Sequence, residues 1–469
     1  MIVSRRHFLQ KTLYTGLLIG SSLSVSLNVA RADKNKPYHY TLTLEPADFP
    51  LIPGTTTPGL GFNGQYPVTP IKAKQGQQLT IRVINKLNQP TTVHWHGIRL
   101  PIAMDGVPFL SQKPIMPGET FVYQFTPPDA GTFWFHPHVN SVEQLGRGLV
   151  GLLIVEEADS DSFSPAQYAA DIPLMLKNWH LNKDGSFKPL MKLRNAARMG
   201  TSGRHQTVNG IAKPVIEVPA NGWVRLRFAN VDNTLVYRLK IKDHPAYIIS
   251  IDANPLDQPR PLDSYSIGVG MRVDIAIKTP QAGSEIVIET LIGKRKHQEL
   301  LRLKTLDMPS TAAVSAGPPL PSKNPLSEPD LSSAEVKRFV FEWEGAITPA
   351  DGEGNTTPKF WAINRIPWAG MSAGQIPEPL AELSLGKSYI FDLKNNTPHR
   401  HPIHIHGIMF KVLRSNQKKI EPFFTDTVLM EKNERVQIAF VADNPGRWMY
   451  HCHVIEHMKT GLMGYIRIS

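Results

Sequence analysis

The chain has 469 residues and a formal net charge of +11, and this length fits roughly three domains. Its 40 prolines and 34 glycines favour a turn-rich β architecture. The sequence has no long basic run and no basic patch interleaved with aromatic residues, so we expect no nucleic-acid partner. The single cysteine permits no intramolecular disulfide. Beyond the leader, no stretch reaches the ~18 consecutive apolar residues that a membrane-spanning helix needs.

Residues 1–32 have the pattern of an export signal. The pair Arg5-Arg6 precedes a moderately apolar stretch, which ends at the small-x-small sequence Ala30-Arg31-Ala32. This arrangement resembles the twin-arginine class of signals, whose export machinery translocates folded proteins. Glycines and serines interrupt the apolar stretch, so a retained membrane anchor is the less favoured alternative. We therefore expect cleavage near Ala32 and a periplasmic mature protein with no stable membrane anchor.

After the leader, the sequence repeats itself three times. The repeats cover residues 37–158, 168–306 and 336–469. Each contains an alternating apolar pattern that ends at an asparagine (Asn85, Asn230 or Asn395), and a period of two is typical of half-buried β-structure. A repeated unit of this kind predicts three similar all-β domains. The stretch 307–335 is rich in proline and serine and is predicted to be a linker, whereas residues 168–203 receive no functional assignment.

Histidines occupy matching positions in the first and third repeats. Nine and eleven residues after Asn85 come His94 and His96, and the same offsets give histidines in the third repeat but Leu239 and Ile241 in the middle one. The four resulting His-x-His pairs are His94/His96, His136/His138, His404/His406 and His451/His453. Single pairs of this kind are weak evidence, but four at matched positions indicate a function. The middle repeat is expected to hold no metal.

The single cysteine lies within the last pair, in His451-Cys452-His453, and His457 follows. In a strand, His451 and His453 point to one face and Cys452 to the other. A thiolate with two imidazoles is the ligand set of a blue-copper site, and imidazoles also suit copper that binds oxygen. A lone cysteine is usually a small buried apolar residue, but three histidines around it argue against that alternative. The segment is therefore predicted to serve two metal sites.

The pairs from the first and third repeats are expected to converge where those two domains meet. Eight imidazoles are enough for three copper ions that share an oxygen molecule. If water is the product, four electrons taken singly from a reductant must reach dioxygen together. A thiolate between two cluster histidines links the electron acceptor to the cluster through one residue, which explains the position of Cys452.

Four motifs together resemble the copper motifs of the multicopper oxidases, the laccase-like three-domain cupredoxin proteins. They are His94-Trp95-His96-Gly97, His136-Pro137-His138, His401-Pro402-Ile403-His404-Ile405-His406-Gly407 and the stretch from His451-Cys452-His453 to His457. The resemblance covers essentially the whole mature chain. It implies an all-β fold of three cupredoxin-like Greek-key β-sandwich or barrel domains, four copper ions and dioxygen as a partner. We expect a monomer.

The resemblance also implies a ligand set. His401, Cys452 and His457 would hold the type 1 copper, with Leu462 at the axial position. His94 and His404 would hold the type 2 ion. The type 3 pair would be held by His96, His136, His138, His406, His451 and His453. Cys452, His451 and His453 would also carry electrons between the sites.

Two acids are predicted to assist this chemistry. Dioxygen reduction consumes protons, and Asp105, nine residues after His96, is similarly placed to an acid that relays them in the family. The alternative for Asp105 is a plain turn residue before Gly106. Asp426 is predicted to orient an imidazole.

The chain departs from the family pattern at two positions. Many bacterial relatives have an acid directly after the last type 1 histidine, whereas this chain has Met458, so the rest of the proton path is unassigned. The usual axial methionine is replaced by Leu462. The adjacent Met463 would face away in an extended strand.

The expected reductants are phenols, aromatic amines or metal ions. Specialists for Cu(I) insert a methionine-rich segment in the third domain, but residues 351–380 contain only Met371, so that role is disfavoured. Oxidation of Mn(II) stays an alternative within the class. A copper-free cupredoxin scaffold of the cell envelope is the alternative from another class, and the complete ligand set argues against it. A third repeat disfavours two-domain nitrite reductases.

Overall fold

The computed structural model describes residues 39–469 except 242, 293–295, 311, 313–314 and 347–357. The predicted export signal at residues 1–32 lies outside the described residues. In the described chain the strands form six sheets, which group in sequence order into three pairs. The predicted all-β architecture is confirmed.

The first domain consists of two four-stranded sheets, with the orders β2-β1-β4-β6 and β3-β8-β7-β5. Its strands are β1 (Tyr40–Phe49), β2 (Thr57–Phe62), β3 (Ile71–Lys74), β4 (Leu79–Asn85), β5 (His94–His96), β6 (Thr120–Phe125), β7 (Gly131–His136) and β8 (Gly151–Glu156). Its helices are η1 (Ile102–Met104) and α1 (Ser141–Gly146). Along β4, buried and half-buried residues alternate, as the apolar pattern predicts.

The middle domain pairs a six-stranded sheet, β10-β9-β12-β17-β14-β15, with a five-stranded sheet, β11-β19-β18-β13-β16. Its strands are β9 (Ala170–Trp179), β10 (His205–Val208), β11 (Val215–Pro219), β12 (Trp223–Asn230), β13 (Tyr237–Ile241), β14 (Ala246–Ile251), β15 (Asn254–Pro261), β16 (Tyr265–Ile267), β17 (Arg272–Lys278), β18 (Glu285–Ile292) and β19 (Lys296–Leu306). Its helices are η2 (Pro165–Gln167) and α2 (Leu193–Ala196).

The third domain pairs the sheet β21-β20-β23-β28-β25-β26 with the sheet β22-β30-β29-β24-β27. Its strands are β20 (Glu335–Ala346), β21 (Lys359–Ile363), β22 (Ala381–Leu383), β23 (Ser388–Asn395), β24 (His401–Ile405), β25 (Phe410–Ser415), β26 (Phe423–Thr425), β27 (Thr427–Met430), β28 (Arg435–Val441), β29 (Gly446–Cys452) and β30 (Met463–Ile468). Helix α3 spans Ile455–Lys459.

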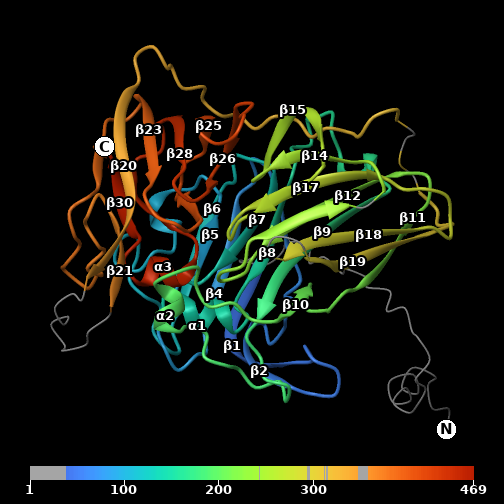
Figure 1. The fold of residues 1–469 in the computed structure, drawn as a ribbon, viewed down its shortest axis with the longest axis horizontal. Helices are drawn as coiled ribbons and strands as arrows, with labels where there is room; N and C mark the ends of the chain where they lie inside the picture. Colours follow the sequence, from blue (N-terminus) through green and yellow to red (C-terminus); the bar gives the residue numbers. More distant parts are fainter. Residues whose placement is uncertain (1–38, 242, 293–295, 311, 313–314, 347–357) are drawn as a thin grey trace, which may run out of the picture.

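One apolar core extends across the first and third domains. Trp95 and Phe133 of the first domain belong to the same buried cluster as Ile403 and Trp448 of the third. The middle domain has a largely separate core. Figure 1 shows the third domain, in orange and red, and the middle domain, in green and yellow, on opposite sides of the molecule, with first-domain strands between them. Burial of this shared apolar surface, at roughly 25 cal/mol per Å², holds the first and third domains together.

Residues 307–334 connect β19 to β20, and no strand or helix occurs in the part of this connection that the structure describes. Asn324, which lies in this connection, forms hydrogen bonds to both the first and the middle domain. Its Oδ1 accepts a hydrogen bond from the Ala130 amide, and its Nδ2 donates to the Ala253 carbonyl oxygen, both at 2.9 Å. The domain limits drawn from the sequence stay predictions.

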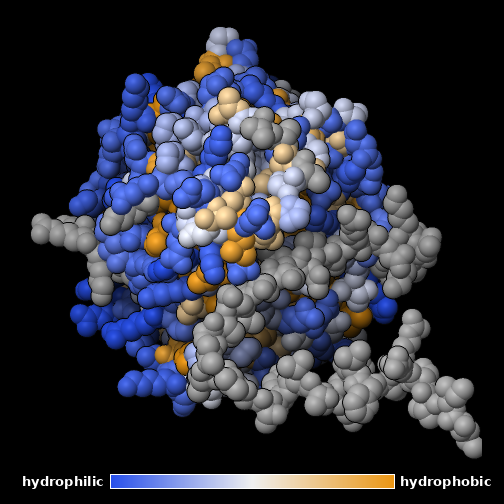
Figure 2. Space-filling model, turned by 90° about the vertical axis from the view of Figure 1, so that its right-hand side faces the viewer, coloured by the Kyte–Doolittle hydropathy of each residue, from blue (hydrophilic) through white to orange (hydrophobic). Residues whose placement is uncertain are grey.

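The described helices are short, and none of them is long and apolar enough to cross a membrane. Helix α1 has six residues and α3 has five. On the face seen in Figure 2, hydrophilic side chains cover most of the described surface, and apolar ones form small groups.

Candidate metal centre

Strand pairing within each sheet brings histidines from separate motifs together. In the third domain β24 lies between β27 and β29, so that His404 is opposite His451 and Ile403 is opposite Cys452. In the first domain β5 pairs with β7, which places His94 opposite His136. Each domain therefore presents two histidine motifs side by side.

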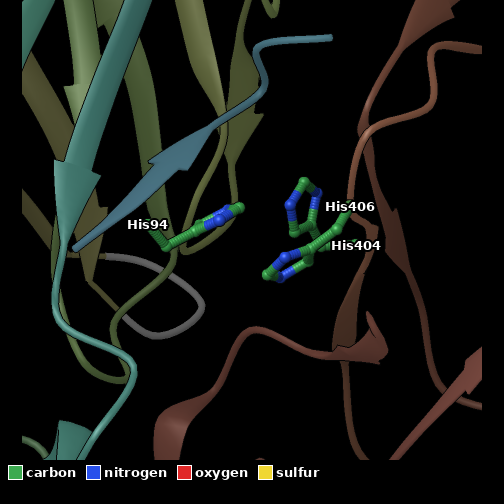
Figure 3. A group of neighbouring side chains, drawn as sticks. All are labelled: His94, His404 and His406. Carbon is green, nitrogen blue, oxygen red and sulfur yellow. The ribbon is translucent and has the colours of Figure 1, made fainter. Parts of the chain in front are cut away.

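The two sets of histidines meet between the first and third domains. His94 stacks on His406 with ring centroids 3.8 Å apart, and His96 stacks on His404 at 3.9 Å. Figure 3 shows His94 reaching from the first domain toward His404 and His406 of the third. The remaining members of this buried eight-imidazole cluster are His136, His138, His451 and His453. The structure thus places all four pairs at one interface, where the sequence predicted convergence.

His94 and His96 both lie in β5, whereas the other three pairs extend past their strands. Strand β7 ends at His136 and β29 ends at Cys452, so His138 and His453 follow the strand ends. His457 lies in α3. His451 and His453 nevertheless contact the cluster while Cys452 contacts the other group, as alternation along the chain predicts.

Several ring nitrogens in the cluster have no hydrogen-bond partner. The Nδ1 atoms of His94 and His404 each lie 2.8 Å from a backbone carbonyl oxygen, of Asp105 and Asp426 respectively. Their Nε2 atoms are buried without a partner, as is the Nε2 of His136. Buried polar groups normally have partners, so these nitrogens fit the donor set of a bound metal.

The protonation state of the cluster histidines also fits a bound metal. Burial is the largest cause of a lowered pKa at seven of these imidazoles: His96, His136, His138, His404, His406, His451 and His453. Neighbouring imidazoles lower most of these pKa values further. The rings are therefore neutral, which is the form that binds metals.

A second, three-residue group consists of His401, Cys452 and His457. Its Nδ1 and Sγ atoms lie 3.1–3.6 Å from one another. The other ring nitrogens are already occupied, because His401 Nε2 contacts Thr397 Oγ1 and His457 Nε2 contacts the Arg198 carbonyl oxygen, both at 2.9 Å. A metal at about 2.0–2.3 Å from N and S ligands needs ligand atoms at such spacings, so this donor set also fits an ion.

Burial raises the pKa of the Cys452 thiol and lowers that of His457 to about 3. The ring of His457 is therefore neutral near pH 7. A coordinating metal deprotonates a thiol outright, so the raised pKa does not prevent ligation.

The chain matches known protein families and solved structures along most of its length. Family profiles described as multicopper oxidase match residues 44–160, 170–298 and 348–469. A multicopper oxidase structure from Pseudomonas thermotolerans is 44% identical, covers 92% of this chain and 99% of its own, and has a TM-score of 0.83. The chain belongs to the multicopper oxidase family. A second structure, from Pseudomonas parafulva, is 45% identical over 91% of this chain and 99% of its own, with a TM-score of 0.80.

Multicopper oxidase mco from Staphylococcus aureus is 26% identical and covers 94% of this chain and 90% of its own length. The predictions of family, of three cupredoxin domains and of a copper-dependent oxidoreductase that uses oxygen are confirmed. The individual ligand assignments stay predictions.

For this multicopper oxidase, the position expected for the axial ligand is fully buried. Leu462 belongs to the same apolar cluster as Cys452, and its carbonyl oxygen accepts a hydrogen bond from the Cys452 amide at 3.0 Å. Met463 packs into other apolar clusters. Met458, which directly follows His457, is a buried residue of α3.

Both predicted acids lie against cluster histidines. The two carboxylate oxygens of Asp105 are 3.2 Å from His94 Nδ1 and 2.9 Å from His406 Nδ1. Asp426 Oδ1 is 3.1 Å from His96 Nε2. Burial raises the pKa of Asp426, but the Arg272 guanidinium and other partners outweigh it and hold this pKa well below its usual range.

The sequence reasoning missed the polar groups that hold these ligands. Thr397 is four residues before His401, and its hydroxyl could have been suspected from that spacing. Arg198 lies in the stretch that received no function, and a backbone carbonyl carries no sequence signal. Arg272 belongs to the domain that lacks histidine pairs.

Proposed function

We propose that the protein oxidises a reductant one electron at a time at a type 1 copper and reduces dioxygen to water at a three-copper cluster. The type 1 ion is held by His401, Cys452 and His457. The observation that carries this proposal is the position of Cys452, whose Sγ lies in the three-residue group while His451 and His453 lie in the cluster.

We further propose that the protein binds four copper ions. His94 and His404 hold the type 2 ion, supported by their unpartnered Nε2 atoms. The type 3 pair is held by His96, His136, His138, His406, His451 and His453. When bound, the copper ions supply one-electron redox chemistry and a binding site for dioxygen.

The chain's own residues orient the ligands and move protons. Two carbonyl oxygens fix the rings of His94 and His404, so their Nε2 atoms face the cluster. Asp105 is 1% exposed and bridges His94 and His406. We assign it the role of holding a proton beside the cluster and passing it on during dioxygen reduction.

Phenols and aromatic amines are the proposed reductants. The His457 ring contacts the chain at Arg198, whose side chain is exposed, as is that of Arg194. Positive charge at this face reduces the local concentration of metal cations. Some relatives are named as laccases and others as iron transport oxidases, such as Laccase-2 of Botryotinia fuckeliana and iron transport multicopper oxidase fio1 of Schizosaccharomyces pombe. Oxidation of Cu(I) or Mn(II) is the alternative role.

Copper-loaded protein is therefore expected to be intensely blue and to consume oxygen with a phenolic dye. Oxygen uptake compared across phenols, Cu(I) and Mn(II) identifies the preferred reductant. Colourless protein that binds no copper would support the copper-free scaffold instead.

The Leu462→Met substitution should lower the type 1 reduction potential. A weak axial thioether stabilises the oxidised ion, which an aliphatic side chain cannot do. The exchange nearly conserves volume, so its packing cost should stay below about 1.5 kcal/mol. Redox titration checks the shift, since ~59 mV changes the one-electron equilibrium tenfold. An unchanged potential would show that residue 462 is not axial and would make Met463 the next position to test.

We also propose that the protein is exported to the periplasm as a folded monomer. Replacing both Arg5 and Arg6 by lysine should leave the uncleaved precursor in the cytoplasm, because the twin-arginine machinery reads that pair. Cell fractionation followed by immunoblotting measures the distribution. Normal export of the double variant would refute the assignment of the signal.

A further inference from the structure

One arginine of the middle domain contacts all three domains. Arg272 opens β17 and is 1% exposed. Its Nε donates to the Thr132 carbonyl oxygen of the first domain at 3.1 Å. Its Nη1 and Nη2 donate to Oδ1 and Oδ2 of Asp426 in the third domain, at 2.9 and 2.6 Å. Within its own domain it also pairs with Asp252 at 3.2 Å.

The carboxylate that Arg272 holds contacts histidines from both ligand-bearing domains. Asp426 Oδ1 accepts from Thr427 Oγ1 at 2.7 Å and lies 3.1 Å from His96 Nε2. The same carboxylate oxygen is 3.4 Å from His404 Nδ1, which also lies 2.8 Å from the Asp426 carbonyl oxygen. An N–H at His96 Nε2 leaves Nδ1 as the free nitrogen, and this Nδ1 faces His453 Nε2 at 3.2 Å. The carboxylate therefore selects the tautomer of His96.

Two glycines make room for this arrangement. A Cβ on Gly97 would lie 2.3 Å from Arg272 Nη2 and 2.6 Å from Asp426 Oδ2. A Cβ on Gly270 would lie 2.7 Å from the His453 ring. Both residues have positive φ values, which glycine adopts without strain. The backbone therefore packs closely against the Arg272–Asp426 pair at Gly97 and against the His453 ring at Gly270.

We infer that Arg272 is a positioning residue for the copper cluster, which fixes Asp426 so that Asp426 fixes His96 and His404. This inference rests on the proposed copper cluster. It gives the middle domain, which carries none of the proposed ligands, a direct part in the site. A bidentate pair between a planar guanidinium and a carboxylate fixes orientation as well as charge.

Arg225 provides a matched control. It is also 1% exposed, lies on the neighbouring strand β12 of the same sheet, and donates to Asp274 at 2.6 Å. Among the described contacts, no hydrogen bond from Arg225 reaches a cluster histidine. Loss of either arginine breaks a buried ion pair within the middle domain, with Asp252 or with Asp274, but only Arg272 also holds a carboxylate that touches the cluster.

The test compares Arg272→Gln and Arg225→Gln in the full-length copper-loaded protein. Copper retained during dialysis against a chelator and the electron paramagnetic resonance signal of the type 2 ion are measured. Removal of a direct partner of a metal ligand typically weakens metal binding about 10- to 100-fold, and Arg272 acts one contact further out, so a loss at the low end of that range is expected. We expect that loss, with an altered type 2 signal, for Arg272→Gln alone, while the blue type 1 absorption persists in both variants.

A second pair, Arg272→Lys and Arg225→Lys, keeps the charge but removes the planar fork. Arg272→Lys should retain more cluster copper than Arg272→Gln but less than the wild type, and Arg225→Lys should match the wild type. If Arg272→Gln does not fold, this pair gives the same comparison.

Equal copper retention and equal spectra in the Arg272 and Arg225 variants would overturn the positioning role. A wild-type protein that fails to bind four copper ions would instead overturn the proposed function. The two failures are therefore distinguishable.

Discussion

Cys452→Ser should give a colourless, inactive protein that keeps three of the four proposed copper ions. The thiolate contributes to the three-residue group alone, since Sγ lies 3.5 Å from His401 Nδ1 and 3.6 Å from His457 Nδ1. Its neighbours His451 and His453 face the cluster. Loss of a direct partner of a metal ligand lowers metal affinity or activity about 10- to 100-fold. Loss of the ligand itself should therefore lower turnover by more than about 100-fold.

Copper analysis, visible absorption and paramagnetic resonance measure this result. Serine conserves the small size and leaves the backbone hydrogen bond from residue 452 to Leu462 intact, so a folding defect is not expected. Loss of all copper would contradict the assignment of two separate sites. Retention of the blue colour would show that Cys452 is not a ligand.

Asp105→Asn should slow the reoxidation of the reduced protein by dioxygen while all four proposed copper ions remain bound. The amide has nearly the shape of the carboxylate but cannot carry a proton. Proton transfer by a positioned group contributes about 10²- to 10⁴-fold, so a loss of about that size is expected. Copper should be retained, because the carbonyl oxygen of residue 105 still holds His94.

Asp129→Asn is the control for this experiment. Asp129 is another buried acid of the first domain, 1% exposed, and it pairs with Arg99 at 2.8 Å. Stopped-flow mixing of reduced protein with oxygen should show a slow phase for Asp105→Asn and normal reoxidation for Asp129→Asn. Equal rates in both variants would return Asp105 to the role of a turn residue before Gly106.

The sequence predicted the parts of this protein that depend on local patterns. Alternating apolar residues such as Leu79, Ile81 and Val83 are buried along β4 as expected. The repeats predicted three similar domains, and the paired histidines predicted where the first and third meet. These features follow from strand periodicity and from repetition, which can be read from a single chain.

Contacts between domains could not be predicted in this way. The contact between Arg272 and Asp426 joins residues 154 positions apart in two domains, and nothing near Arg272 in the sequence marks it. The Arg198 carbonyl oxygen reaches His457 because the residues after α2 lie against α3, where the Thr201 amide also donates to a Glu456 carboxylate oxygen.

The proposed cluster draws its ligands from opposite ends of the chain, which fixes when it can form. The cluster ligands of the first domain end at His138, and the last cluster ligand of the third domain is His453. At about 5–20 residues per second, a ribosome needs roughly 15–60 s to make the segment between them. Throughout that interval, the nascent chain contains the four cluster imidazoles of the first domain but not all four of the third domain. The full set of proposed cluster ligands can therefore come together only after His453 has been made, and any ion bound earlier would be held by half a site.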